Sequence, residues 1–263
     1  MNMLRRYVGN DAFQKGLQMY FDKFKYQNTI GENLWDCLSE ASGKNVADFM
    51  NTWLFKSGYP SVLAKKDGEE LKLSQKQFFI GDGKDSGRIW PILLGSNQNN
   101  LPEIMDSKDL AFKKSSDFVQ LNQGNVAHFI TNYSQNLFEN LLEKVRNGDL
   151  DTISRLQILQ ERSLLSRGGE IPSVELLRTL ESYDKETSLT VWDMISLLIG
   201  ELKIFIDEDS ESSKKMKKFV GNLAQNEFEK LGFIKKTGED EEDTQKRSSI
   251  LAHMIYAENK KAI

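Results

Sequence analysis

Histidine is the side chain that zinc hydrolases most often use to hold their metal, and this chain has two, His128 and His253. Enzymes with two histidine ligands usually place them four residues apart on one helix, with a glutamate between them. Here the first histidine lies in a predicted strand and the second in a predicted helix, and no His-Glu-x-x-His sequence occurs. We therefore interpret both as structural or surface residues and assign no catalytic, metal-binding or substrate-binding residue.

Cys37 is the single cysteine, so no disulfide can form within the chain. It lies in an apolar helical stretch, residues 34–38, with no local histidine or cationic partner to activate its thiol. We interpret it as a small buried side chain rather than a nucleophile. Low cysteine use is typical of the reducing cytoplasm, where we expect this protein to be located.

A run of five acidic residues occupies positions 239–243. Calcium-binding loops alternate their oxygen ligands with other residues and need a glycine at the turn, and this run does not follow that pattern. Carboxylates are favourable at the start of a helix, where backbone N–H groups lack partners and the helix dipole is positive. We therefore interpret the run as a loop followed by a helix N-terminus.

Two other short motifs do not indicate a binding site. Gly81-Asp82-Gly83 leads into a polar loop instead of a helix, so it does not match a nucleotide-binding turn, and no P-loop is present. The basic stretch at 214–218 is short and has acidic residues on one side, which predicts a solvated helix face. With a net charge of -4 and both signs interspersed, we expect no nucleic-acid partner.

The composition is that of an ordinary globular protein. The chain has 263 residues, of which 39% are hydrophobic and 28% are charged, enough for one large domain or two to three small ones. A sizeable core can form without disulfides or metal. The longest apolar runs are far too short to span a bilayer, and the first residues lack a secretory signal, so we expect no membrane partner.

Three regions with different periodicity follow one another along the chain. Residues 3 to about 57 predict three helices, with Gly9 ending one helix, Asn10-Asp11 capping the next, and Gly43 and Gly58 as later stops. From 61 to about 133, short apolar runs alternate with turn residues, which predicts a small antiparallel β-sandwich. Expected strands include 71–74, 89–94, 118–121 and 126–130.

After residue 132 the apolar residues again recur at helical spacing. Expected helices include a strongly apolar and therefore central one at 192–206, followed by 219–231 and 248–256. The short connections favour antiparallel neighbours, as in bundles and helical solenoids. The residues alone thus predict an α+β protein of unknown activity.

Several segments, taken together, resemble zinc aminopeptidases of the aminopeptidase N family, particularly those of lactic-acid and related Gram-positive bacteria. The first part resembles the end of the catalytic domain in Met3-Leu4-Arg5, Phe13-Gln14-Lys15-Gly16-Leu17, Tyr26-Gln27-Asn28-Thr29, Leu34-Trp35 and Gly58-Tyr59-Pro60. The later parts resemble the β-sandwich and helical domains that follow it, in Leu73-Ser74-Gln75-Lys76-Gln77-Phe78, Trp90-Pro91-Ile92 and Leu156-Gln157-Ile158-Leu159-Gln160-Glu161-Arg162.

The resemblance implies a multidomain α+β architecture. Residues 1–59 would be the helical end of a thermolysin-like catalytic domain, 60–133 a β-sandwich, and 134–263 the first part of a solenoid-like or bundled helical domain. In such enzymes zinc activates water to remove N-terminal amino acids from peptides, and a tyrosine stabilises the transition state. Tyr7 and Tyr20 do not match the context of that tyrosine, so no residue role is transferred.

The implied role is that of a piece that frames and restricts the active site of a larger zinc enzyme. Such a piece would contain no cofactor of its own, would be inactive alone, and would have an upstream catalytic domain and peptide substrates as partners. Apolar surface of residues 3–57 would be exposed in isolation. The alternative is a stand-alone scaffold of β-sandwich and helices that binds a peptide or protein partner on its concave face.

Overall fold

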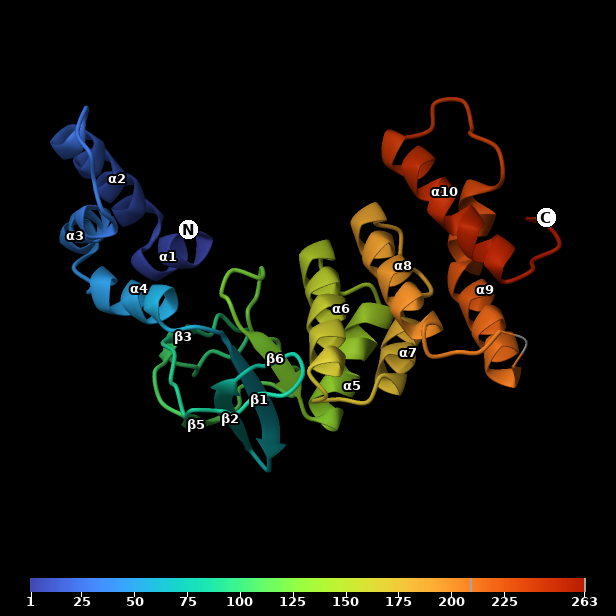
Figure 1. The fold of residues 1–263 in the computed structure, drawn as a ribbon, viewed down its shortest axis with the longest axis horizontal. Helices are drawn as coiled ribbons and strands as arrows, with labels where there is room; N and C mark the ends of the chain where they lie inside the picture. Colours follow the sequence, from blue (N-terminus) through green and yellow to red (C-terminus); the bar gives the residue numbers. More distant parts are fainter. Residues whose placement is uncertain (209, 263) are drawn as a thin grey trace. The chain divides into compact units, whose positions relative to one another are not determined.

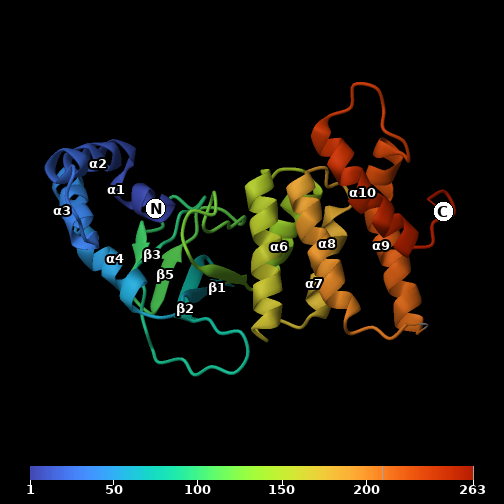
Figure 2. The same ribbon diagram turned by 45° about the horizontal axis from the view of Figure 1, so that its top comes forward.

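The computed structural model describes residues 1–208 and 210–262, and the chain divides into two compact units between Leu137 and Phe138 (Figures 1 and 2). The first unit contains helices and a small mixed sheet, and the second is helical. This confirms the α+β class. The finer division into 1–59, 60–133 and 134–263 stays a prediction.

The first unit begins with four helices where three were expected. They are α1 (Asn2–Val8), α2 (Asn10–Phe24), α3 (Gly31–Ser42) and α4 (Val46–Phe55). Gly9 separates α1 from α2 because its φ of 89° lies in the region that favours glycine. Gly9 is also the N-cap of α2, without a side-chain hydrogen bond, so the expected capping by Asn10-Asp11 is wrong. Gly43 closes α3 in the left-handed conformation, as predicted.

The helices of this unit share an apolar core that contains Leu4, Trp35, Leu38 and Phe49. Helices α2 and α3 approach closely at Gly16, where a Cβ atom would lie 2.7 Å from Leu38 Cδ2 and 3.0 Å from Leu38 Cα. Glycine is therefore required at this position by packing and not by backbone conformation.

The strands that follow form a mixed sheet and a separate antiparallel pair, β3 with β4, so the fully antiparallel arrangement expected from the sequence is wrong. They are β1 (Pro60–Asp67), β2 (Glu70–Gln77), β3 (Ile92–Leu93), β4 (Ile104–Met105), β5 (Asp109–Lys113) and β6 (Ile130–Tyr133). The order in the larger sheet is β5-β2-β1-β6, and β1 pairs with β6 in parallel. A parallel pair needs a long crossover, which residues 68–129 supply. Leu71 and Leu73 of β2 alternate inward, as predicted.

Several expected strands are irregular because buried amide side chains bind the backbone in place of a neighbouring strand. Only Ile92–Leu93 of the expected 89–94 is a strand. Next to it, Gln75 Nε2 donates to Trp90 O at 3.0 Å and Gln75 Oε1 accepts from Trp90 N at 2.9 Å. Asn122 bonds in the same way to the N–H and carbonyl of Ala127. The expected strands at 118–121 and 126–130 are therefore wrong except for Ile130 and the bridge Ser96–Leu121.

The second unit continues from α5 and is helical throughout its described residues. Its elements are α5 (Gln135–Arg146), α6 (Thr152–Arg167), α7 (Val174–Leu180), the 3-10 turn η1 (Glu181–Tyr183), α8 (Leu189–Lys203), α9 (Glu211–Leu231) and α10 (Glu241–Tyr256). Helix α8 buries Trp192, Ile195 and Leu198 and contacts both α6 and α10, which confirms the expected central helix.

Helices α9 and α10 begin earlier than expected, at 211 and 241, because Ser210 and Asp240 cap them. None of the helices in the described ranges is both long and apolar enough to cross a bilayer.

The contact at Gly16 gives a stability prediction. We expect Gly16→Ala to lower the free energy of unfolding by about 1–3 kcal/mol, because the new methyl group overpacks the α2–α3 interface. Gly200→Ala is the matched control, since this helical glycine has no atom within 4 Å of an added Cβ. There we expect about 0.5–1 kcal/mol of stabilisation from helix propensity. Urea unfolding measures both, and equal signs would contradict the packing argument.

Candidate functional site in the helical unit

Within residues 1–208 and 210–262, no three His, Cys, Asp or Glu side chains gather closely enough to hold a metal ion. Cys37 is buried in α3, as predicted. His128 lies in an irregular segment before β6, not in the expected strand, and its ring is 4.7 Å from that of Tyr59. His253 lies in α10, as expected, and belongs to the other unit.

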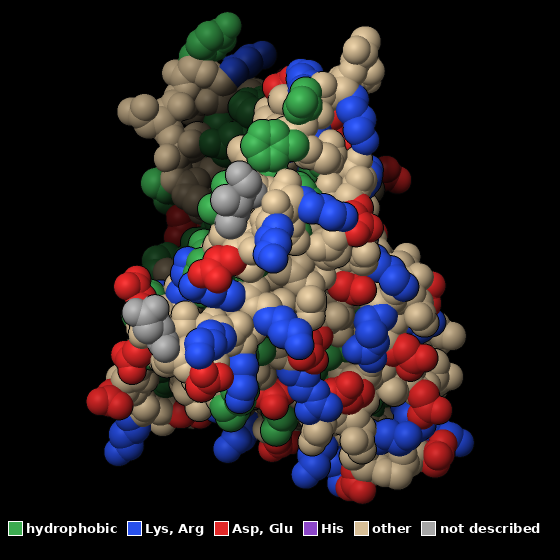
Figure 3. Space-filling model, turned by 90° about the vertical axis from the view of Figure 1, so that its right-hand side faces the viewer, with side chains coloured by type: hydrophobic (Ala, Val, Ile, Leu, Met, Phe, Trp, Pro, Cys, Tyr) green, Lys and Arg blue, Asp and Glu red, His purple; other side chains and the backbone are tan. Residues whose placement is uncertain are grey.

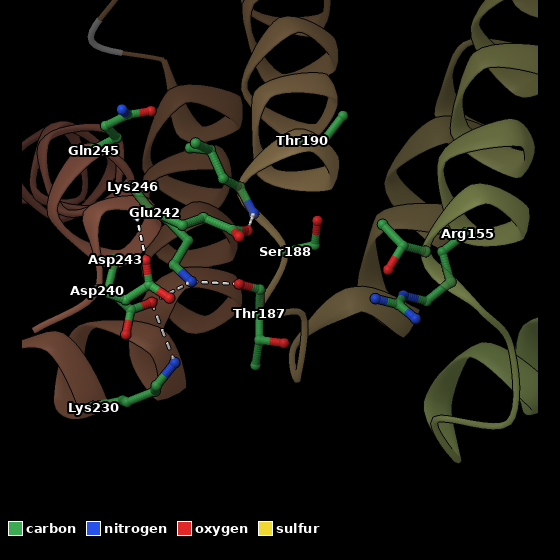
Figure 4. Close-up of a pocket in the computed structure, with 12 residues that line it drawn as sticks. Arg155, Thr187, Ser188, Thr190, Lys230, Asp240, Glu242, Asp243, Gln245 and Lys246 are labelled. Carbon is green, nitrogen blue, oxygen red and sulfur yellow. Dashed lines mark hydrogen bonds and ion pairs between the residues drawn. The ribbon is translucent and has the colours of Figure 1, made fainter.

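An open cavity of about 790 Å³ lies where α6, α8 and α10 begin, and charged side chains surround it (Figure 4). Sequence periodicity did not indicate this site, because its residues come from four separate helices, α6, α8, α9 and α10, and from the connections before α8 and α10. The lining is electrically balanced: Arg155, Lys230 and Lys246 face Asp240, Glu242 and Asp243.

Lys246 of α10 is the centre of this group. Its side chain is 1% exposed, and its ammonium nitrogen lies 2.8 Å from Glu227 and 2.9 Å from Asp243. It also donates to the carbonyl oxygen of Thr187 in the loop before α8 (Figure 4). Burial would lower the pKa of Lys246, but the hydrogen bonds that its ammonium group donates to the two carboxylates, with their negative charge, outweigh burial and raise the pKa. This geometry makes Lys246 a structural cation that holds the two carboxylates and the loop.

Arg155 of α6 holds the same loop through Glu186. Its Nε and Nη2 donate to the two oxygens of Glu186 at 2.7 and 2.9 Å, a bidentate pair. One of these oxygens also accepts from the backbone N–H groups of Thr187 and Ser188, both at 2.8 Å. Burial would raise the pKa of Glu186, but these hydrogen bonds and the positive charge of Arg155 lower it. The loop is thus fixed by α6 through Glu186 and by α10 through Lys246.

The acidic run at 239–243 lies at the end of a loop and the start of α10, as predicted from the sequence. Asp240 caps α10 by accepting from the N–H of Glu242 at 3.0 Å, and the next three acidic residues form the first turn. Glu242 reaches further and accepts from the N–H of Leu189, the first residue of α8, at 2.8 Å. Asp240 and Glu242 therefore accept from N–H groups at the starts of α10 and α8, and Asp243 pairs with Lys246.

His253 of α10 joins α8 through a hydrogen bond of 2.8 Å between its Nε2 and Ser196 Oγ. Ser196 Oγ also donates to the carbonyl of Trp192 at 2.8 Å, so the hydroxyl accepts from His253 instead of being activated by it. Burial, helped by the charge of Lys203, lowers the pKa of His253 to about 4. The hydrogen bond between Ser196 and His253 therefore links α8 to α10, and the two residues do not act as a nucleophile and its general base.

The basic stretch at 214–218 forms part of α9. Lys214 pairs with Glu211 at 2.6 Å and Lys217 with Glu258 at 2.6 Å, while Met216 is buried. On the face shown in Figure 3, Lys and Arg are interspersed with Asp and Glu. The lysines of this stretch therefore lie on a solvated helix face, as predicted.

Removing the charge of Lys246 tests the network. We expect Lys246→Met to lower the free energy of unfolding by about 3–5 kcal/mol, because it leaves the buried carboxylate of Glu227 without its main partner. Urea unfolding of the chain measures this. Lys214→Met, which breaks only the exposed pair with Glu211, should cost less than about 1 kcal/mol. Equal effects of the two substitutions would contradict a buried network.

The low pKa of His253 predicts acid sensitivity. Its folded value of about 4 lies below the ordinary 6.5, so the unfolded chain binds more protons between these values. Stability from this group is complete above pH 6.5 and falls by about 3 kcal/mol as the pH approaches 4. Urea unfolding at pH 7.5, 6 and 5 should show a steeper loss for the parent chain than for His253→Gln. Parallel pH profiles would refute the assignment.

Comparisons with known proteins place this architecture in a family. A family model described as ERAP1-like C-terminal domain matches residues 118–263, and one described as Peptidase family M1 domain matches residues 1–53. An aminopeptidase N of Lactococcus lactis subsp. lactis is 45% identical over 98% of this chain. Aminopeptidase M1-B of Oryza sativa subsp. japonica is 30% identical over 97%, and aminopeptidase 2 of Candida albicans is 29% identical over 100%.

The chain spans about a third of the length of these curated relatives, since it covers 31%, 31% and 30% of them. The match to the Peptidase family M1 domain includes α1 to α3 and most of α4. The match to the ERAP1-like C-terminal domain begins before β6 and includes the helical unit. The resemblance expected from the segments of the sequence is thereby confirmed, and the chain belongs to the aminopeptidase N family of M1 peptidases.

Proposed function

We propose that this chain is part of a zinc-dependent aminopeptidase that removes N-terminal amino acids from peptides. The observation that carries the proposal is the 45% identity to an aminopeptidase N over 98% of the chain. Because the similarity extends from the first helices through the helical unit, it favours this function over a stand-alone scaffold.

The described residues do not fit the zinc site of such an enzyme. They contain no cluster of three candidate ligands, and the two histidines lie in different compact units. We therefore derive no catalytic step from this chain and propose that other polypeptide supplies the zinc ligands. In the whole enzyme, zinc would activate the water that attacks the peptide bond.

Residues 1–59 would form the helical end of a thermolysin-like catalytic domain, which the match to the M1 domain over residues 1–53 supports. The exposed apolar side chains of this region support docking onto the rest of that domain. They include Phe21, Tyr26, Ile30, Leu54 and Phe55. Isolated chains would associate through this surface.

Residues 60–133 would form the β-sandwich that supports the helical domain, and residues 134–263 would begin the helical domain that limits access to the active site. The ion pairs of Arg155 and Lys246 support a framing role, because they fix the connections between helices without offering a reactive group. The low cysteine content supports a cytoplasmic location.

Two activity measurements test this function. We expect the purified chain with added zinc to leave lysyl- and alanyl-p-nitroanilide intact, because it lacks the ligand cluster. A chimaera in which this chain replaces the matched portion of the Lactococcus lactis aminopeptidase N should hydrolyse both substrates in a zinc-dependent manner. The same relative without that portion is the control and should be inactive.

Turnover by the chain alone that a chelator abolishes would overturn its proposed inactivity. A folded chimaera that binds zinc yet hydrolyses neither substrate would overturn the proposed place of this chain in an aminopeptidase. Zinc content and circular dichroism distinguish such a chimaera from a misfolded one.

A further inference from the structure

A second cavity, of about 600 Å³, also has Arg155 in its lining. The end of α5, the turn η1 and the loop before α8 line it, and all of its lining residues belong to the helical unit. It shares Arg155, Glu186 and Thr187 with the network that holds the loop, and the hydroxyl of its Tyr183 donates to the backbone carbonyl of Arg155 at 2.8 Å.

The charges that line this cavity are unbalanced. Three cations, Arg146, Arg155 and Lys185, face a single carboxylate, Glu186. Glu186 is fully engaged by Arg155 and by two backbone N–H groups. Among the described residues, no carboxylate pairs with Arg146 or Lys185, whereas the nearby Lys144 has Asp149 at 3.0 Å. The balanced lining of the first cavity has no such excess.

The polar groups beside the two free cations can also serve an anion. Arg146 Nη1 donates to the hydroxyl of Ser182 at 2.8 Å, and Ser182 is 2% exposed. Because Ser182 accepts this bond, its own hydroxyl hydrogen is available to a ligand. The guanidinium of Arg146 has further N–H groups in a planar fork that suits carboxylate and phosphate oxygens.

We propose that this cavity binds a small oxyanion, a carboxylate or phosphate group, between Arg146, Lys185 and the hydroxyl of Ser182. The geometry leaves the bidentate pair of Arg155 and Glu186 intact as the wall of the site. Binding would neutralise two cations that the described part of the chain leaves without acidic partners, and it requires no zinc and no aminopeptidase activity.

Isothermal titration of the purified 263-residue chain tests the proposal with three probes: acetyl-Ala-Ala, its C-terminal amide, and inorganic phosphate. We expect the free acid, phosphate or both to bind and the amide not to bind. The double variant Arg146→Gln/Lys185→Gln should weaken binding by about tenfold or more, since it removes both charged donors. Lys215→Gln, an exposed lysine of α9, is the matched control for loss of charge and should bind normally.

Binding of the acid alone would identify a peptide carboxylate as the source of the anion, and binding of phosphate alone would identify a phosphate group. Absence of saturable binding up to about 20 mM of either anion would overturn the proposal. An equal loss of affinity in Lys215→Gln, or an unchanged affinity in a double variant with native circular dichroism, would also overturn it.

Discussion

The side chain of Lys246 is almost fully buried, and the stability of the helical unit depends on the partners of its ammonium group. A buried charge without partners costs several kcal/mol, so the positions of Glu227, Asp243 and the carbonyl of Thr187 are strongly constrained. Those three groups come from α9, α10 and the loop before α8. One side chain thereby sets how three consecutive elements meet.

The same loop is held from the opposite side by a second buried charge pair, Arg155 with Glu186. Glu186 also accepts from the backbone N–H groups of the two residues that come directly before α8, so it fixes the chain where it enters this helix. Glu242 adds an equivalent bond from α10 to Leu189. Two acidic side chains from outside α8 thus hold the start of this helix, and Arg155 compensates the charge of Glu186.

The sequence predicted well which regions are helical, but it predicted the strands and their pairing poorly. Helical periodicity found α8 and its central position, and the acidic run was correctly interpreted as a helix start, because both depend on neighbours along the chain. The parallel pairing of β1 with β6 was missed, since nothing local specifies which strands meet. The strand expected at Trp90 failed because Gln75, a polar residue of β2, occupies its hydrogen-bonding groups. The charged cavities were missed because their residues converge from several elements.

The parallel pair of β1 and β6 has a consequence for the order of folding. Ser61 pairs with Ile130 and Ala64 with Tyr133, so the edge of the sheet cannot close until a long intervening segment has become ordered. Contacts of such sequence separation slow folding, whereas the helical unit is dominated by contacts between successive helices. The first unit, which is translated before the helical unit, would then be the slower of the two to reach its final state. The edge of β1 and the apolar surface of this unit would stay exposed to solvent until β6 has been translated.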